Sequence, residues 1–271
     1  MSADAALNRW YDFLRRITEK HAALLEEART GCAALHLEAD LDPGPMTNAW
    51  TGFNAQALAL ESKVMNTWNE QVSDLFESSG VSRKQTGEER ARGEATAARM
   101  EWDRESTRLK LFGDAARRVW ERAWKEMAQV TPCSQCGEQV PVPPHTYQAI
   151  NLTCPACDAV NTFEPGTWVR MIQWFCAHAL AEENAFELWY PRAQAENARR
   201  SARSSTLKLI QAEEAATLAY WRRYLEVRAQ VCPTYAPGIQ ADLKGKMDAF
   251  YRFLEYDDAW IRAGKPRMPL A

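Results

Sequence analysis

Residues 131–165, TPCSQCGEQVPVPPHTYQAINLTCPACDAVNTFEP, decide how the rest of this chain is interpreted. They hold two Cys-x-x-Cys pairs, Cys133 with Cys136 and Cys154 with Cys157, and seventeen residues separate the pairs. Each pair presents two thiols from one tight turn. The segment therefore predicts a small element organised by cysteine, set within a chain that is otherwise helical in pattern.

The residues after each Cys pair suit a tight turn. Gly137 follows the first pair, and glycine adopts the left-handed backbone that such turns need. Asp158 follows the second pair, and Asp tolerates that conformation better than most residues. We expect short strands over 147–153 and 159–163, with the Cys pairs at the ends of a hairpin.

Four cysteines in this spacing are typical of a metal site. Zinc prefers four tetrahedral ligands, and two Cys-x-x-Cys pairs close that shell without an open position. Iron fits the same four thiolates. Two disulfides are the non-metal alternative, but nothing in the sequence marks a secreted chain.

The segment resembles a zinc ribbon, a small β module with two rubredoxin-like knuckles. The resemblance covers about 35 of the 271 residues, and no family is recognised for the remainder. It implies a structural Zn²⁺ with Cys133, Cys136, Cys154 and Cys157 as its ligands. It does not define a function, because zinc ribbons recognise both nucleic acids and proteins. With the ligand set complete, we expect His145 to be a solvated loop residue.

The composition is that of an ordinary water-exposed chain. Hydrophobic residues make up 46% and charged residues 25%, and the net charge is −3. This charge gives no general attraction to nucleic acid. The first residues lack an apolar signal core, and no run of 18 apolar residues occurs. We therefore expect no membrane span and a cytoplasmic location.

Apolar residues outside the Cys segment recur at steps of three and four, which predicts long helices. We expect an antiparallel hairpin of helices over 4–40 and from 46 to about 78, then a loop or frayed helix start over 81–95. A third helix runs to the first Cys pair, and a fourth starts at Thr167 and ends or kinks at Pro191. Further helices follow within 192–231 and over 239–263.

The predicted fold class is all-α, a long antiparallel helical bundle or coiled-coil hairpins with a small inserted β zinc ribbon. The predicted domains are 1–130, the helical hairpin with the third helix; 131–165, the ribbon; and 166–271, the helices that complete the bundle. In the first helix His21 lies on the apolar seam, where we expect a hydrogen-bonded core histidine rather than a metal ligand.

Recognisable catalytic motifs are absent from the sequence. It has no phosphate-binding loop, no dinucleotide fingerprint and no His-Glu-x-x-His. None of the four His residues follows a Glu by three positions, which removes the di-iron motif of helical bundles. Cys32, Cys176 and Cys232 are interpreted as packing residues. We therefore expect no enzyme and nominate no catalytic or organic-cofactor residue.

The sequence favours a structural or adaptor protein, a helical scaffold with a zinc-ribbon tip for protein–protein interaction. The ribbon contains no Lys or Arg, so we expect a phosphate backbone to be repelled. Val140, Val142 and Tyr147 are the partner-binding candidates, on an apolar edge expected to be exposed. Such an edge also suits the protein's own helices, in which case the ribbon only caps the bundle.

The alternative function is nucleic-acid binding through basic faces of the third and fifth helices, Arg104 to Lys125 and Arg192 to Lys208. Those ranges also contain acidic residues at spacings suited to ion pairs along a helix. We therefore expect a protein partner and no nucleic acid. A homo-oligomer is a further alternative, because long apolar helix seams rich in Trp can bury more surface than one chain supplies.

Overall fold

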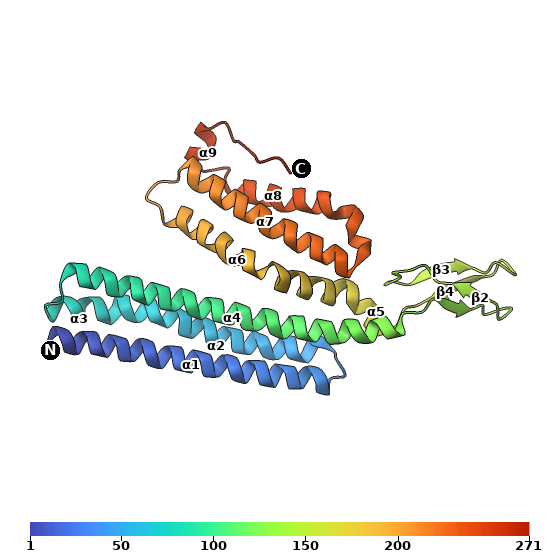
Figure 1. Cartoon of the computed structure of the whole chain (residues 1–271), viewed down its shortest axis with the longest axis horizontal. Helices are drawn as coiled ribbons and strands as arrows, with labels where there is room; N and C mark the ends of the chain where they lie inside the picture. The colour runs from blue at the N-terminus through green and yellow to red at the C-terminus, as the bar shows by residue number, and fades with distance from the viewer. Residues whose placement is uncertain (271) are drawn as a thin grey trace. The chain divides into compact units, whose positions relative to one another are not determined.

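The computed structural model describes residues 1–270, most of which are helical (Figure 1). The long helices are α1 (Ala3–Glu38), α2 (Pro43–Thr67), α4 (Arg83–Glu126), α6 (Ala177–Ser201) and α7 (Leu207–Val231). The shorter ones are η1 (Trp68–Val72), α3 (Ser73–Ser78), α5 (Thr167–Met171), η2 (Ile172–Cys176), η3 (Pro233–Gly238), α8 (Ile239–Phe253) and α9 (Asp258–Arg262). Two two-stranded sheets lie between α4 and α5. The predicted fold class, helical with a small β insertion, is confirmed.

The chain forms two compact units, residues 1–111 and residues 112 onward, so the division falls inside α4. We call them the N-terminal and C-terminal units. The three-part division expected from the sequence differs from this one and stays a prediction. None of the helices within residues 1–270 is long and apolar enough to cross a membrane.

The N-terminal unit begins with the predicted antiparallel hairpin, in which α1 and α2 lie side by side (Figure 1). The Ser2 hydroxyl caps α1, accepting a hydrogen bond from the Ala5 amide at 3.3 Å. Asp42 caps α2 in the same way through the Gly44 amide. Helix α2 starts at Pro43 rather than at residue 46, because proline fits the first helical position, where no N–H is needed.

Residues 83–95 form the first turns of α4, so of the two alternatives expected for 81–95 the helix start is right and the loop is wrong. Ser82 accepts a hydrogen bond from the Gln85 amide at 3.2 Å and starts α4. The buried carboxylate of Glu89 accepts a hydrogen bond from the Tyr11 hydroxyl at 2.7 Å, which ties this polar stretch to α1. A Cβ on Gly93 would lie 2.9 Å from the Trp10 ring. Gly93 is therefore a site of close helix packing and not a loop signal.

A buried ionic cluster joins the three long helices of the N-terminal unit, α1, α2 and α4. The Glu61 carboxylate on α2 accepts a hydrogen bond from Arg104 Nε on α4 at 2.8 Å and lies 3.2 Å from His21 Nε2 on α1. Arg104 also donates to the Asn54 side chain at 2.9 Å. All three members of the central group are buried. The prediction that His21 is a hydrogen-bonded core residue is confirmed.

The C-terminal unit is built mainly on α6, α7 and α8. Pro191 lies inside α6, which continues to Ser201. Of the predicted end or kink at Pro191, the end of the helix is therefore wrong. Contacts on both sides of the proline hold the helix against α7: Ala185 lies in the shared core, and Arg199 pairs with Glu213. The predicted last helix is divided, because Asp257 caps a separate α9.

The buried cluster predicts a large difference between two superficially similar arginines. Arg104→Met would leave the Glu61 carboxylate without its cation, and we expect unfolding to become easier by about 3–5 kcal/mol. Arg15 pairs with Glu19 on an exposed face, so Arg15→Met is expected to cost less than about 1 kcal/mol. Urea unfolding followed by circular dichroism compares the two, and equal losses would contradict a structural role for the cluster.

Candidate metal centre

Two β hairpins carry the four cysteines. Strands β1 (Val130–Pro132) and β2 (Gln139–Pro141) form the first antiparallel pair, and β3 (Ile150–Thr153) and β4 (Val160–Phe163) form the second (Figure 1). Each Cys-x-x-Cys pair lies at the turn of its own hairpin. The strands predicted within 147–153 and 159–163 are confirmed. The β1–β2 hairpin was not expected, because each of its strands is three residues long and includes a proline.

The two turns have equivalent hydrogen bonds. In the first, the Cys133 amide donates to the Glu138 carbonyl at 2.8 Å and the Gly137 amide to the Cys133 carbonyl at 3.0 Å. In the second, the Cys154 amide donates to the Ala159 carbonyl at 2.9 Å and the Asp158 amide to the Cys154 carbonyl at 3.0 Å. Gly137 and Asp158 have φ of 78° and 58°. The left-handed residues expected after each pair are confirmed.

The turns bring all four cysteine sulfurs within 4.8 Å of one another. Cys133 Sγ lies 3.7 Å from Cys157 Sγ, and Cys136 Sγ lies 3.7 Å from Cys154 Sγ. A disulfide would need about 2.05 Å. Four sulfurs at about 2.3 Å from a central ion would be separated by about 3.8 Å. The cysteines are thus free thiols whose spacing fits a tetrahedral metal site and not the disulfide alternative.

The environment of Cys133 favours the thiolate, which is the form that binds metal, whereas burial and the neighbouring cysteine sulfurs raise the pKa of Cys136 and Cys157. Cys133 and Cys154 are buried, whereas Cys136 and Cys157 are exposed. The backbone amides of Cys136 and Gln135 point at Cys133 Sγ and lower its pKa to about 6. A thiolate held by amide donors can bind an ion without first losing a proton at neutral pH.

Asn161 connects the two turns, and sequence analysis missed it. This buried side chain lies on β4, where its Oδ1 accepts from the Ser134 amide at 2.8 Å and from the Ser134 hydroxyl at 2.9 Å. Its Nδ2 donates toward Cys133 Sγ at 3.5 Å and to the Ala159 carbonyl at 3.1 Å. One amide from the second hairpin thus orients the first. The available signal was a polar residue at an inward-facing strand position, four residues after Cys157.

The expected exposure of the partner-binding candidates is wrong. Val140, Val142 and Tyr147 have exposed fractions of 2%, 8% and 4%. Val140 packs with Cys133 and Cys154 beneath the metal centre. The Tyr147 ring packs in a cluster with Val169 and Ile172 of the following helices, and burial raises its pKa. This edge therefore covers the protein's own interior, which is the second possibility the sequence left open.

The remaining cysteines lie apart from this cluster of four. Cys32, Cys176 and Cys232 are each fully buried. Burial raises the pKa of Cys176 to about 12 and also raises the pKa of Cys32, which keeps both thiols protonated. Their prediction as packing residues is confirmed. His145 is half-buried, with Nδ1 3.3 Å from the Tyr147 hydroxyl, so it is not simply solvated.

In comparisons with known proteins, no family model, no curated protein and no solved structure matches this chain.

The ligand set gives the first prediction for this site. Cys133→Ser and Cys154→Ser are expected to lose the ion, about one equivalent per chain, and to unfold the two hairpins, because structural metal sites stabilise their own fold. Most of the helical circular dichroism should persist. Metal analysis of the purified proteins measures the loss, and Cys176→Ala, which removes a buried thiol outside the cluster, is the control. Metal retained by both Ser variants would contradict the assignment.

Asn161 gives the second prediction. Asn161→Asp would place a carboxylate against Cys133 and remove its N–H donor, and we expect metal affinity to fall roughly 10–100-fold. The exposed Asn151 on the neighbouring strand offers a matched control, Asn151→Asp. Transfer of the ion to a colorimetric chelator measures both, and equal affinities for the two variants would rule out the orienting role of Asn161.

Proposed function

We propose that the four cysteines bind a structural Zn²⁺ and that the chain is a non-enzymatic structural or adaptor protein whose zinc ribbon serves protein–protein interaction. The sulfur cluster carries this proposal. Four protein ligands complete the tetrahedron, whereas catalytic zinc keeps one position for water or substrate. The free thiols suit a reducing compartment, and we place the protein in the cytoplasm. Iron in the same site is the alternative that metal analysis decides.

The charge of the ribbon favours a protein partner over a nucleic acid. Residues 131–165 contain no Lys or Arg, and their charged side chains are the acids Glu138, Asp158 and Glu164. Four thiolates on Zn²⁺ add a formal charge of about −2. Binding to phosphates depends on cations that displace counterions, and this surface has none. The matching partner is a protein surface that combines apolar contacts with positive charge.

The exposed apolar residues of the ribbon are not those expected from the sequence. Val160 at the start of β4 is 66% exposed, and Val130 at the start of β1 is 50% exposed. Cys136 and Cys157 lie exposed at the turns. We propose Val160 and Val130 as partner-contacting residues in place of the buried Val140, Val142 and Tyr147. A homo-oligomer stays a prediction.

The nucleic-acid alternative has less support than the sequence suggested. Several of its cations on α4 are already paired: Arg104 with Glu61, Arg117 with Asp114 and Glu183, and Arg122 with Glu126. A paired cation releases few counterions when it meets a phosphate. This alternative stays a proposal that a salt-dependent titration tests.

Changing Val160 tests the adaptor proposal. Val160→Asp adds a carboxylate to an acidic surface without disturbing the core, so we expect the capture of a partner from cells that express the protein to fall at least tenfold. Leu58→Asp, at an exposed apolar position on α2, is the matched control. The metal content of both variants should equal that of the parent.

Two outcomes would contradict the adaptor proposal. One is a partner captured equally by Val160→Asp and by the parent protein. The other is tight binding of DNA or RNA that weakens steeply between 50 and 200 mM salt. A salt dependence as steep as that expected for several phosphate contacts would favour the nucleic-acid alternative.

A further inference from the structure

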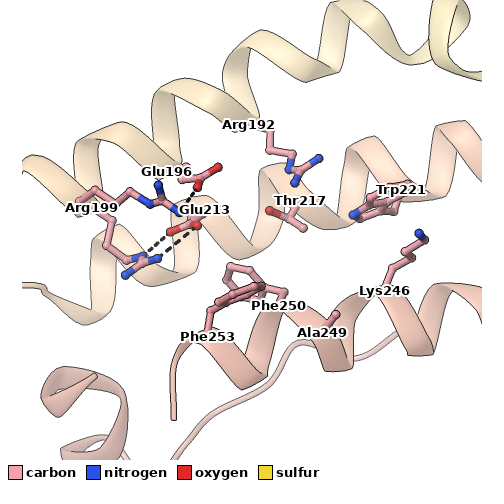
Figure 2. Close-up of a pocket in the computed structure, with 11 residues that line it drawn as sticks. Arg192, Glu196, Arg199, Glu213, Thr217, Trp221, Lys246, Ala249, Phe250 and Phe253 are labelled. Carbon is pink, nitrogen blue, oxygen red and sulfur yellow. Dashed lines mark hydrogen bonds and ion pairs between the residues drawn. The ribbon is translucent and has the colours of Figure 1, made fainter. Parts of the chain in front are cut away.

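A second candidate site lies far along the sequence from the cysteines, between α6, α7 and α8. It is a pocket of about 340 Å³ within the C-terminal unit (Figure 2). Helix α6 contributes Arg192 and Arg199, α7 contributes Glu213 and Trp221, and α8 contributes Lys246. Sites for small ligands have volumes of about 300–1,000 Å³, so this pocket has room for a small molecule.

The charges of the pocket are balanced at one end only. Figure 2 shows Arg199 directed at Glu213, and Arg200 lies 2.7 Å from Glu196. These pairs neutralise two cations and both acids of the lining. Arg192 and Lys246 have no ion-pair partner among residues 1–270. The pocket therefore has an excess of two positive charges.

Both unpaired cations lie against the same aromatic ring. Arg192 Cζ is 5.5 Å and Lys246 Nζ is 4.3 Å from the ring centroid of Trp221. A cation–π contact holds a cation in place but does not neutralise it, so the N–H donors stay available. A guanidinium and an ammonium that contact the same indole can both donate to a carboxylate or a phosphate.

An apolar wall lies across the pocket from Arg192 (Figure 2). Phe250 is buried in the core, and Phe253, one turn further along α8, also lines the pocket although its side chain is 79% exposed. Figure 2 shows the two rings together on the side of the pocket away from Arg192. A flat ligand could stack on Phe253 and bury surface that is now open to water.

We propose that this pocket binds a small organic anion that carries a flat apolar ring. The anionic group lies against Arg192 and Lys246, and the ring lies along Phe253. The Glu213 end is neutral because its acids are paired with arginines, so the excess positive charge at the other end fixes the orientation of the ligand. No bond is made or broken, so the proposal concerns binding alone and does not rest on the metal centre or on the adaptor function.

The test uses 1-naphthyl phosphate as the probe and isothermal titration calorimetry on the full-length, metal-loaded protein. We expect a dissociation constant below about 1 mM, which is reasonable for a ligand of this size. Arg192→Gln and Lys246→Gln should each weaken binding at least threefold, and the double variant at least tenfold. Lys244→Gln, on the exposed face of α8 and outside the pocket, should leave binding unchanged.

Phe253→Ala tests the ring contact separately. Because Phe253 is mostly exposed, this variant should keep the thermal midpoint of the parent and weaken 1-naphthyl phosphate at least threefold. Inorganic phosphate and 1-naphthol, which each supply half of the probe, should bind at least tenfold more weakly than the whole probe. Replacing 1-naphthyl phosphate with 1-naphthoate shows whether the site prefers a phosphate or a carboxylate.

Three results would overturn the proposal. The first is no heat of binding with 1-naphthyl phosphate at 5 mM, roughly five times the expected dissociation constant. The second is equal binding by the double cation variant and the parent. The third is binding of inorganic phosphate as tight as that of the whole probe, which would remove the role of the ring.

Discussion

Four sulfur atoms within 4.8 Å of one another are the constraint on which the β insertion depends. Its strands are three or four residues long, and two-stranded hairpins of that size are marginal in water. The apolar core between them consists mainly of Cys133, Cys154 and Val140. Without an ion, thiolates 3.7 Å apart would repel each other. If the four cysteines bind the proposed ion, metal binding and folding of this segment are the same event.

Tyr147 is the main apolar link between the β insertion and the helices that follow it. This ring joins the insertion to Val169, Ile172 and the buried Cys232, so an unfolded ribbon would expose one side of that cluster. The larger cores contain no ribbon residue: α6, α7 and α8 pack around Leu225, Leu243 and Met247, and the N-terminal unit packs around Trp10 and Trp68. In the N-terminal unit the buried Glu61–Arg104 pair adds a polar requirement that selects one packing of α1, α2 and α4.

Most of the correct sequence predictions depend only on neighbouring residues. The errors occur where contacts between residues far apart in the sequence determine the structure. The Cys quartet, Gly137 and Asp158 follow from turn and ligand geometry, which need only neighbouring residues. The apolar seam of α1 includes His21, and its later buried residues Leu25, Cys32 and His36 follow the 3.6-residue turn of a straight helix rather than a strict 3.5 repeat. Burial of Tyr147, continuation of α6 through Pro191 and the role of Asn161 each depend on a distant partner. No pattern in one sequence identifies such a partner.

The C-terminal unit contains two candidate binding regions of opposite charge. The ribbon has acids and thiolates without a cation, whereas the pocket on α6, α7 and α8 has two cations without acidic partners. Helix α6 belongs to both regions, since Ala177 lies in the Tyr147 cluster and Arg192 lies at the pocket, about four turns further along. Coupling between two sites requires an element with two arrangements that both ligands bias. Helix α6 packs against α7. If this helix has a single arrangement, the proposed ion and anion bind independently, each recognised by its own charge.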